Sequence, residues 1–314
     1  MGVMRIGHVA LDVLDVQAAR RHYEEVLGLL VTDVGPDGAV YLKGWDEWDQ
    51  YSVVLRPGPR PALAHLGLKC EHDRDLDVLG QRLRDAGHAC EMLPAGRLHQ
   101  TGRSLQLDLP SGQRMYLYAQ KKHAGRLVGD RNPEPWPDGL KGAGVHWLDH
   151  LLLMCPLDPA SGINTVEQNV ALFTDVLEFH VSEQVRVGPE PGIRAAAFLF
   201  RSSKPHDIAF IGAPRAGLHH LAFYVDEWSD VLRSADVLAK KKVRVDVTPQ
   251  RHGITRGATM YFFDPSGIRN EIFAGLGYLA QPDMPTITWS EQELWRGIFY
   301  HTGVAYEEFT TVYT

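Results

Sequence analysis

A chain of 314 residues is about twice the usual size of one domain, so two packed halves are favoured over a single deep core. The formal net charge of −7 argues against a phosphate-neutralising surface, and no nucleic-acid partner is expected. The apolar fraction of 44% and the charged fraction of 23% are those of an ordinary globular protein and exclude a largely disordered chain.

No signal peptide is expected from the N-terminal residues. The first segment, MGVMRIGHVALDV, reaches Asp12 before an apolar stretch is long enough, and no later segment approaches a membrane span. Cys70, Cys90 and Cys155 form no CxxC pair, and their odd number suits a reducing compartment. We interpret all three as small core residues. The sequence therefore predicts a cytoplasmic protein with no membrane partner.

Along the chain, one local pattern occurs four times: a His followed by alternating apolar residues, beginning at His8, His65, His150 and His220. Alternation with period two indicates a β-strand, and helical apolar spacing follows in residues 16–30 and 165–180. Further short strands are expected near residues 51 and 206. This rhythm predicts an α+β fold of four βαβββ modules.

The modules pair into two predicted domains. Residues 1–120 form an N-terminal domain without catalytic function, and residues 146–280 form a catalytic C-terminal domain. Residues 121–145 are rich in Pro and Gly and lack apolar periodicity, which is typical of a linker. Residues 281–314 form a tail with a short amphipathic helix, which would cover a core edge or a neighbouring subunit.

The two halves align on the turns at residues 110–112 and 265–267, both Pro-Ser-Gly. In this alignment Tyr116 follows His65 at the same distance as Glu271 follows His220. The frame is therefore repeated while one residue type differs. The N-terminal trio is His8, His65 and Tyr116, and the C-terminal trio is His150, His220 and Glu271.

The C-terminal trio has the chemistry of a metal site. Two neutral imidazoles and one carboxylate make a three-ligand face that leaves open positions on iron(II), whereas a phenol is a poor ligand there. We therefore predict iron(II) bound by His150, His220 and Glu271. Neighbouring strand residues point to opposite faces, so His219 cannot share a face with His220 and is left as a supporting or structural residue.

The other differences concern groups that transfer protons. His206 aligns with Tyr51, Tyr261 aligns with Gln106, and His252 aligns approximately with Arg97. We predict that His206, Tyr261 and His252 act near the metal. Alternative readings stay open: Glu271 would form a salt bridge to an arginine, Tyr261 would be an ordinary strand residue, and His252 would belong to a loop.

The sequence resembles the catechol 2,3-dioxygenase family, type I extradiol enzymes of the vicinal oxygen chelate superfamily, over nearly its whole length. The matching segments are Gly-His-Val near residue 8, residues 148–150, 204–214, 217–223, 248–257 and 260–273, and the C-terminal FTTVYT. The resemblance implies iron bound by His150, His220 and Glu271, with His206, His252 and Tyr261 on the substrate side. It also implies a homotetramer.

The activity that this resemblance implies is ring cleavage of a catechol by dioxygen to 2-hydroxymuconic semialdehyde or an analogue. Tyr261 or His252 would accept or orient a substrate proton, and His206 would stabilise bound oxygen and return a proton. Two alternatives are a metal-dependent enzyme of the glyoxalase type and a metal-free protein that binds an aromatic ligand. The ring substituents and the division of work between His252 and Tyr261 stay open.

Overall fold

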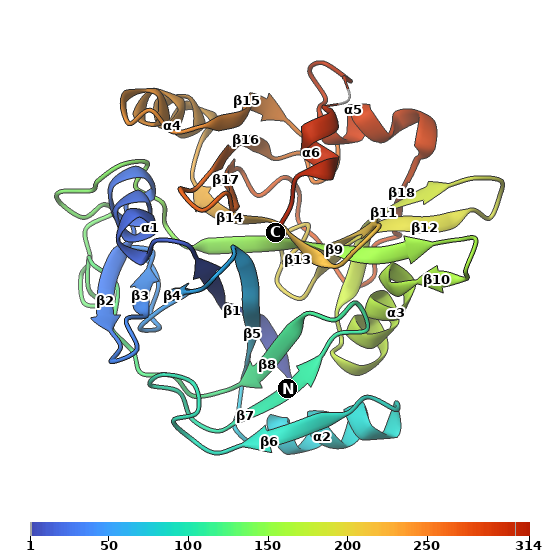
Figure 1. Cartoon of the computed structure of the whole chain (residues 1–314), viewed down its shortest axis with the longest axis horizontal. Helices are drawn as coiled ribbons and strands as arrows, with labels where there is room; N and C mark the ends of the chain where they lie inside the picture. The colour runs from blue at the N-terminus through green and yellow to red at the C-terminus, as the bar shows by residue number, and fades with distance from the viewer. Residues whose placement is uncertain (1, 305) are drawn as a thin grey trace.

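The computed structural model describes residues 2–304 and 306–314. Two mixed β-sheets form the molecule, and the four long helices lie around its periphery (Figure 1). The N-terminal sheet uses strands between residues 3 and 118, and the C-terminal sheet uses strands between residues 148 and 290. The α+β fold predicted from the repeat is therefore confirmed.

The N-terminal sheet has eight strands in the order β2-β3-β4-β1-β5-β8-β7-β6. Its first module comprises β1 (Val3–Val13), α1 (Val16–His22), a π-helical turn (Tyr23–Leu27), β2 (Leu30–Val34), β3 (Val40–Lys43) and β4 (Val53–Pro57). Its second module comprises β5 (Ala62–Cys70), α2 (Asp75–Asp85), β6 (Cys90–Leu93), β7 (Ser104–Asp108) and β8 (Arg114–Tyr118).

The C-terminal sheet follows the same plan, in the order β15-β16-β17-β14-β9-β13-β12-β11-β18, with β10 paired to β9. Its first module comprises β9 (Leu148–Asp158), β10 (Ile163–Asn164), α3 (Thr165–Ala171), a π-helical turn (Leu172–Val176), β11 (His180–Val187), β12 (Ile193–Phe200) and β13 (Ile208–Ala213). Its second module comprises β14 (Gly217–Val225), α4 (Trp228–Lys240), β15 (Val245–Arg251), β16 (Ala258–Phe263) and β17 (Arg269–Ala274).

The two halves repeat local details as well as topology. Helix α1 begins at Asp15, whose carboxylate accepts from two backbone N–H groups, and α3 begins at Asn164, whose side chain accepts from one. Such caps satisfy donors that a helix N-terminus leaves unpaired. Both helices then change to a π-helical turn at the same position, which the apolar spacing alone did not predict.

The Pro-Ser-Gly turns join the halves. The hydroxyl oxygen of Ser111 accepts from the Asn169 side chain of α3 at 2.7 Å, and that of Ser266 accepts from the Leu14 backbone N–H at 3.0 Å. One continuous apolar core contains residues of both sheets. Cys70 and Cys155 are buried in this core, whereas Cys90 on β6 is partly buried and packs against its edge.

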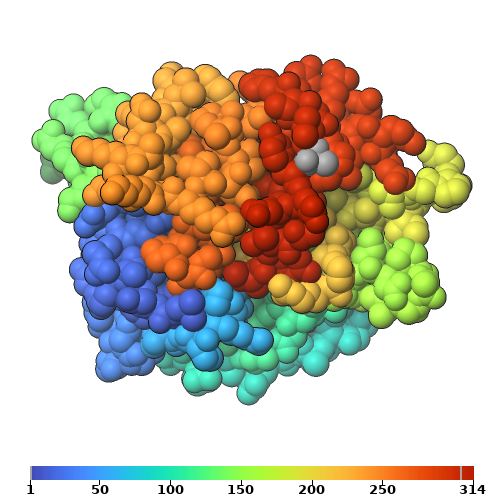
Figure 2. All heavy atoms as spheres, turned by 45° about the horizontal axis from the view of Figure 1, so that its top comes forward, coloured from blue at the N-terminus to red at the C-terminus, as the bar shows by residue number. Residues whose placement is uncertain are grey.

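The C-terminal tail packs on its own chain. Strand β18 (Ile287–Ser290) extends the C-terminal sheet beside β11, and α5 (Leu294–Ile298) and α6 (Glu307–Thr311) follow. Figure 2 shows these residues, in red, lying across the face between the orange and yellow parts of the chain. Among all described residues, no helix has the length and apolar character that a membrane crossing requires.

Candidate active site

Three neighbouring strands bring the predicted ligand trio together. On the central strand β14, Ala222 pairs with His150 of β9 on one side and with Glu271 of β17 on the other. Paired residues point to the same face of a sheet, and His220 lies two residues before Ala222 on that face. The backbone register alone therefore directs all three side chains to one point.

The three side chains converge closely. Oε2 of Glu271 lies 3.0 Å from Nε2 of His150 and 3.0 Å from Nε2 of His220. One potential donor atom from each residue lies within 4.8 Å of the other two. Their exposed fractions are 2% for both histidines and 0% for Glu271. A buried, convergent set of two nitrogens and one oxygen is the donor set of a divalent transition metal.

Glu271 is held as an anion by histidines. Burial raises the pKa of its carboxyl group, but the imidazoles of His220 and His150 outweigh burial and hold this pKa well below 4.5. Thr259 donates a hydrogen bond to Oε1. Within the described part of the chain no arginine contacts Glu271, and Arg269 instead pairs with Asp246 at 2.9 Å. The alternative reading of Glu271 as a structural salt bridge is therefore wrong.

Both imidazoles direct Nε2 toward the convergence point. His150 turns Nδ1 to the carboxylate of Asp149 at 2.8 Å, so Nε2, which faces Oε2 of Glu271 at 3.0 Å without a metal, is the nitrogen that would give its lone pair to a metal ion. Nε2 of His220 is buried and lies 3.0 Å from Oε2 of Glu271, but among the described residues it makes no hydrogen bond of good geometry. An unpaired buried nitrogen costs free energy, and a bound cation would remove that cost. The trio therefore fits a metal ion.

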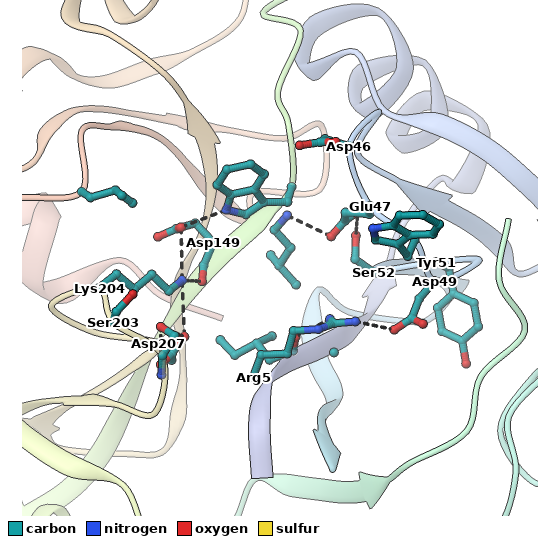
Figure 3. Close-up of a pocket in the computed structure, with 17 residues that line it drawn as sticks. Arg5, Asp46, Glu47, Asp49, Tyr51, Ser52, Asp149, Ser203, Lys204 and Asp207 are labelled. Atoms are coloured by element: carbon teal, nitrogen blue, oxygen red, sulfur yellow. Dashed lines mark hydrogen bonds and ion pairs between the residues drawn. The ribbon is translucent and has the colours of Figure 1, made fainter. Parts of the chain in front are cut away.

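Asp149 is anchored from the side away from this point. Its Oδ1 lies 3.1 Å from Nζ of Lys204, which is 3.5 Å from Asp207. Figure 3 shows this cluster at one wall of a hollow of about 340 Å³, opposite Arg5 from the N-terminal half. Of the charged groups in this hollow, Lys204 contacts Asp149 and so holds it, and through it the ring of His150, in place.

In front of the trio lies a narrow cavity of about 50 Å³. The three remaining predicted residues, His206, His252 and Tyr261, line it together with His150 and His220. The other walls are mostly apolar and come from both modules and from the tail: Leu152, Phe198, Ile211, Ile254, Thr255, Ile298 and Phe309. Convergent polar groups in a small apolar cavity are typical of a binding site for a small aromatic molecule.

His206 stands beside His150 in this cavity. Their ring centroids are 4.0 Å apart, and the Phe198 ring covers His206 at 5.5 Å. Burial, with the neighbouring His150, lowers the pKa of His206 well below 6.5. His206 therefore presents a neutral imidazole, which can donate one hydrogen bond and accept another.

His252 and Tyr261 form a hydrogen-bonded pair opposite His206. Nδ1 of His252 donates to the backbone oxygen of Ile298, so its Nε2 is the nitrogen that accepts from the Tyr261 hydroxyl at 2.8 Å. Burial and the nearby Glu271 raise the pKa of Tyr261 well above 10.0. Tyr261 therefore lies in the cavity as a neutral phenol, paired in register with Glu271.

All six residues predicted from the sequence lie at this site, but the sequence analysis did not identify four residues that contact them or close the cavity. Asp149 and Lys204 anchor His150, Thr259 binds Glu271, and Phe309 closes the cavity. Thr259 could have been inferred, because it lies two residues before Tyr261 on the same face. Phe309 begins the FTTVYT segment that carries part of the family resemblance, but its place at the cavity could not be predicted, because it depends on how the tail folds back.

Family models match both halves. Residues 147–272 match the Glyoxalase/Bleomycin resistance protein/Dioxygenase superfamily, and residues 63–122 match the catechol 2,3-dioxygenase-like N-terminal domain. The first match contains all six predicted residues.

Full-length relatives agree with these matches. The chain is 43% identical to the metapyrocatechase of Pseudomonas sp. (strain CF600), over 100% of this chain and 99% of the relative. It is 26% identical to a manganese-dependent 2,3-dihydroxybiphenyl 1,2-dioxygenase of Geobacillus genomosp. 3, over 95% and 94%. The solved structure of the 2,3-dioxygenase LapB from Pseudomonas sp. KL28 covers 92% of this chain and 98% of its own, with 35% identity and a TM-score of 0.86. The chain therefore belongs to the metapyrocatechase family of extradiol dioxygenases.

Proposed function

We propose that this chain is a catechol 2,3-dioxygenase that opens a catechol ring beside its two hydroxylated carbons, using iron(II) held by His150, His220 and Glu271. The observation that carries the proposal is the convergence of these donors at the base of a cavity lined by His206, His252 and Tyr261. When bound by these residues, the metal would supply a Lewis acid for the catechol oxygens and a redox-active centre for the reaction with dioxygen.

The Tyr261–His252 pair is placed to take a substrate proton. The Tyr261 hydroxyl donates to Nε2 of His252, so its oxygen keeps lone pairs free to accept from a catechol O–H. As that proton moves to Tyr261, the phenol proton moves to Nε2 of His252. The charge formed on His252 is stabilised by the Ile298 backbone oxygen that Nδ1 contacts. In this proposal both residues act in series, Tyr261 first and His252 second.

His206 serves the opposite side of the cavity. Its neutral imidazole can accept a proton released by the substrate, and the resulting imidazolium can give that proton to oxygen later in the reaction and become neutral again. Phe198 and Ile211 exclude water from the same region. A proton held there reaches the reacting oxygen rather than bulk solvent.

The size of the cavity favours a single aromatic ring. At about 50 Å³ it is far smaller than the roughly 300–1,000 Å³ of a pocket for a drug-sized ligand. We therefore propose catechol or a catechol with a small substituent as substrate. A second fused or linked ring would require Ile298 and Phe309 of the tail to move.

The test is anaerobic reconstitution of the purified chain with iron(II), followed by catechol and air. We expect dioxygen uptake and a yellow product at equal rates, and no product from the metal-free chain. Manganese(II) is the matched control, because one relative is named as manganese-dependent. Product formed without metal, or bound iron without product, would contradict the proposal.

A homotetramer and a cytoplasmic location stay predictions from the sequence. Light scattering would test the assembly, with an expected mass about four times the 35.1 kDa of one chain.

A further inference from the structure

His219 precedes the proposed metal ligand His220 and has no part in the function proposed above. We propose that His219 is a positioning residue that fixes the tautomer of His220 and ties it to the C-terminal tail through the backbone oxygen of Phe309. This inference rests on the proposed metal site, and it concerns how the protein keeps Nε2 of His220 ready for the metal.

Two contacts place His219 between the ligand and the tail. Its Nδ1 lies 2.7 Å from Nδ1 of His220, and its Nε2 contacts the backbone oxygen of Phe309 in α6. The side chain is 2% exposed. Two ring nitrogens at 2.7 Å in a dry environment must share one hydrogen, because two facing lone pairs would repel.

The tail determines which nitrogen holds that hydrogen. A carbonyl oxygen only accepts, so Nε2 of His219 must carry a hydrogen toward Phe309. The guanidinium of Arg269 donates to the backbone oxygen of His219 at 3.5 Å and to the tail, so the residue and its anchor are held by the same group. Nδ1 of His219 then holds a lone pair and accepts from Nδ1–H of His220. That hydrogen bond leaves the lone pair of His220 on Nε2, toward Glu271.

The repeat of the fold makes this arrangement specific to one half. His219 is the extra residue of a bulge between Leu218 and His220, where β14 shifts register against β9. The N-terminal sheet has the same bulge between β5 and β1, and there the extra residue is Ala64. Bulges re-aim side chains, and here the re-aimed imidazole meets its neighbour. Ala64 offers no hydrogen-bonding group to His65.

The tail is held firmly enough to act as the anchor. Arg269 donates to the backbone oxygens of Val312 at 2.6 Å and Glu308 at 3.1 Å, on either side of Phe309. The last residue, Thr314, pairs with Leu218 through its backbone N–H at 3.1 Å. The segment that closes the cavity is therefore the same segment that orients His220.

Two substitutions separate a positioning role from simple packing. His219→Leu removes both nitrogens at similar volume, whereas His219→Gln keeps an amide oxygen that can accept from His220 and an amide N–H that can donate to Phe309. Iron(II) affinity is measured by competition with a chelator, and the thermal stability of the metal-free forms is measured alongside. We expect His219→Leu to weaken iron(II) binding roughly 10- to 100-fold and His219→Gln to restore most of it.

The wild-type chain in the same assay separates the two proposals. A wild type that binds no iron(II) would reject the metal site itself, whereas equal affinities of the wild type and His219→Leu would reject only the role of His219. Equal losses in Leu and Gln variants would also reject it. If His219→Leu does not fold, ¹⁵N spectra of the zinc-loaded, histidine-labelled full chain decide: a protonated Nδ1 on His219 overturns the proposal.

Discussion

The two halves use one backbone frame in opposite ways. In the N-terminal sheet Gly67 pairs with His8 on one side and Tyr116 on the other, which is the arrangement of Ala222 between His150 and Glu271. The frame that makes a metal site in one half is therefore intact in the other. Side chains alone make the difference.

The N-terminal half offers a histidine, a phenol and a buried lysine where the other half offers an acid. Nζ of Lys121 lies 3.2 Å from Nδ1 of His8, and the Tyr116 hydroxyl donates to Gln106 at 2.9 Å. The supporting positions have changed too, because Gly7 occupies the bulge position of Asp149. A Cβ at Gly7 would meet the Tyr118 oxygen at 1.9 Å, so that half cannot hold a carboxylate behind His8. A metal site thus needs its second layer as well as its ligands.

The largest difference between the two halves is expected from the substitution Glu271→Gln, compared with Tyr116→Phe at the equivalent position of the N-terminal half. We expect the first substitution to lower iron(II) content and to reduce kcat/KM by at least about 1,000-fold, because an amide supplies no charge to a divalent ion. Tyr116→Phe loses only the hydrogen bond to Gln106 and should leave both values unchanged. Metal analysis and initial rates measure both.

An active Glu271→Gln variant with normal iron content would remove the distinction between the halves. So would loss of iron from Tyr116→Phe, because it would place a metal in the N-terminal sheet.

The next comparison pairs His206→Phe with Tyr51→Phe. His206 and Tyr51 lie at equivalent positions, two residues before β13 and β4 respectively. His206 is not one of the converging donors, so its loss should leave iron content unchanged while kcat falls by roughly 10²- to 10⁴-fold. Tyr51 hydrogen-bonds to the His99 backbone oxygen at 2.9 Å, and its loss should lower stability by about 1 kcal/mol without changing kcat.

Iron content and single-turnover rates check this pair. A His206→Phe variant that turns over at the wild-type rate would show that His206 only packs beside His150.

The sequence predicted the features that follow from a fixed period. Strand alternation and the equal spacing of Glu271 and Tyr116 located the trio, because adjacent strands in register carry paired residues to one face. The same reasoning placed Tyr261 opposite Glu271, as the structure shows. It did not predict the bulges at Asp149 and His219, since a bulge arises from pairing between strands far apart in sequence.

Contacts made by the tail were also beyond sequence reasoning. Phe309 reaches the cavity across a distance set by β18 and α5, and its backbone oxygen contacts His219 regardless of side chain. A backbone contact leaves no residue pattern. The sequence therefore predicted a helix in the tail, but it did not predict that the tail closes the cavity.

A smaller effect is expected from opening the cavity. The groove beside His65 and Tyr116 is also bordered by the tail, at Tyr313 and Thr314, yet it measures about 1,030 Å³, against about 50 Å³ beneath Phe309. Phe309→Ala keeps the backbone oxygen but removes a buried ring. We expect the kcat/KM ratio of 3-phenylcatechol to catechol to rise about tenfold, since relief of one steric contact is worth about 1–3 kcal/mol. Competition between the two substrates measures this ratio, and an unchanged ratio would show that other walls set ring size.

The smallest effect concerns Lys121, the buried lysine beside His8. Burial lowers the pKa of this ammonium well below 10.5, although the Tyr51 ring lies 3.8 Å beneath it. The unfolded chain therefore binds a proton more readily than the folded one, and this group's contribution to stability rises with pH up to the unfolded value.

Lys121→Met should remove that slope and leave turnover unchanged. The variant should exceed the wild type in stability most at pH 7, with a difference that shrinks toward pH 10 by at most about 1.4 kcal/mol per pH unit. Urea unfolding of metal-free protein across this range measures the difference. A constant difference would mean that the folded chain keeps Lys121 charged, held by the aromatic rings. The N-terminal half would then resemble its partner more closely, since both would enclose a cation beside the first histidine of the trio.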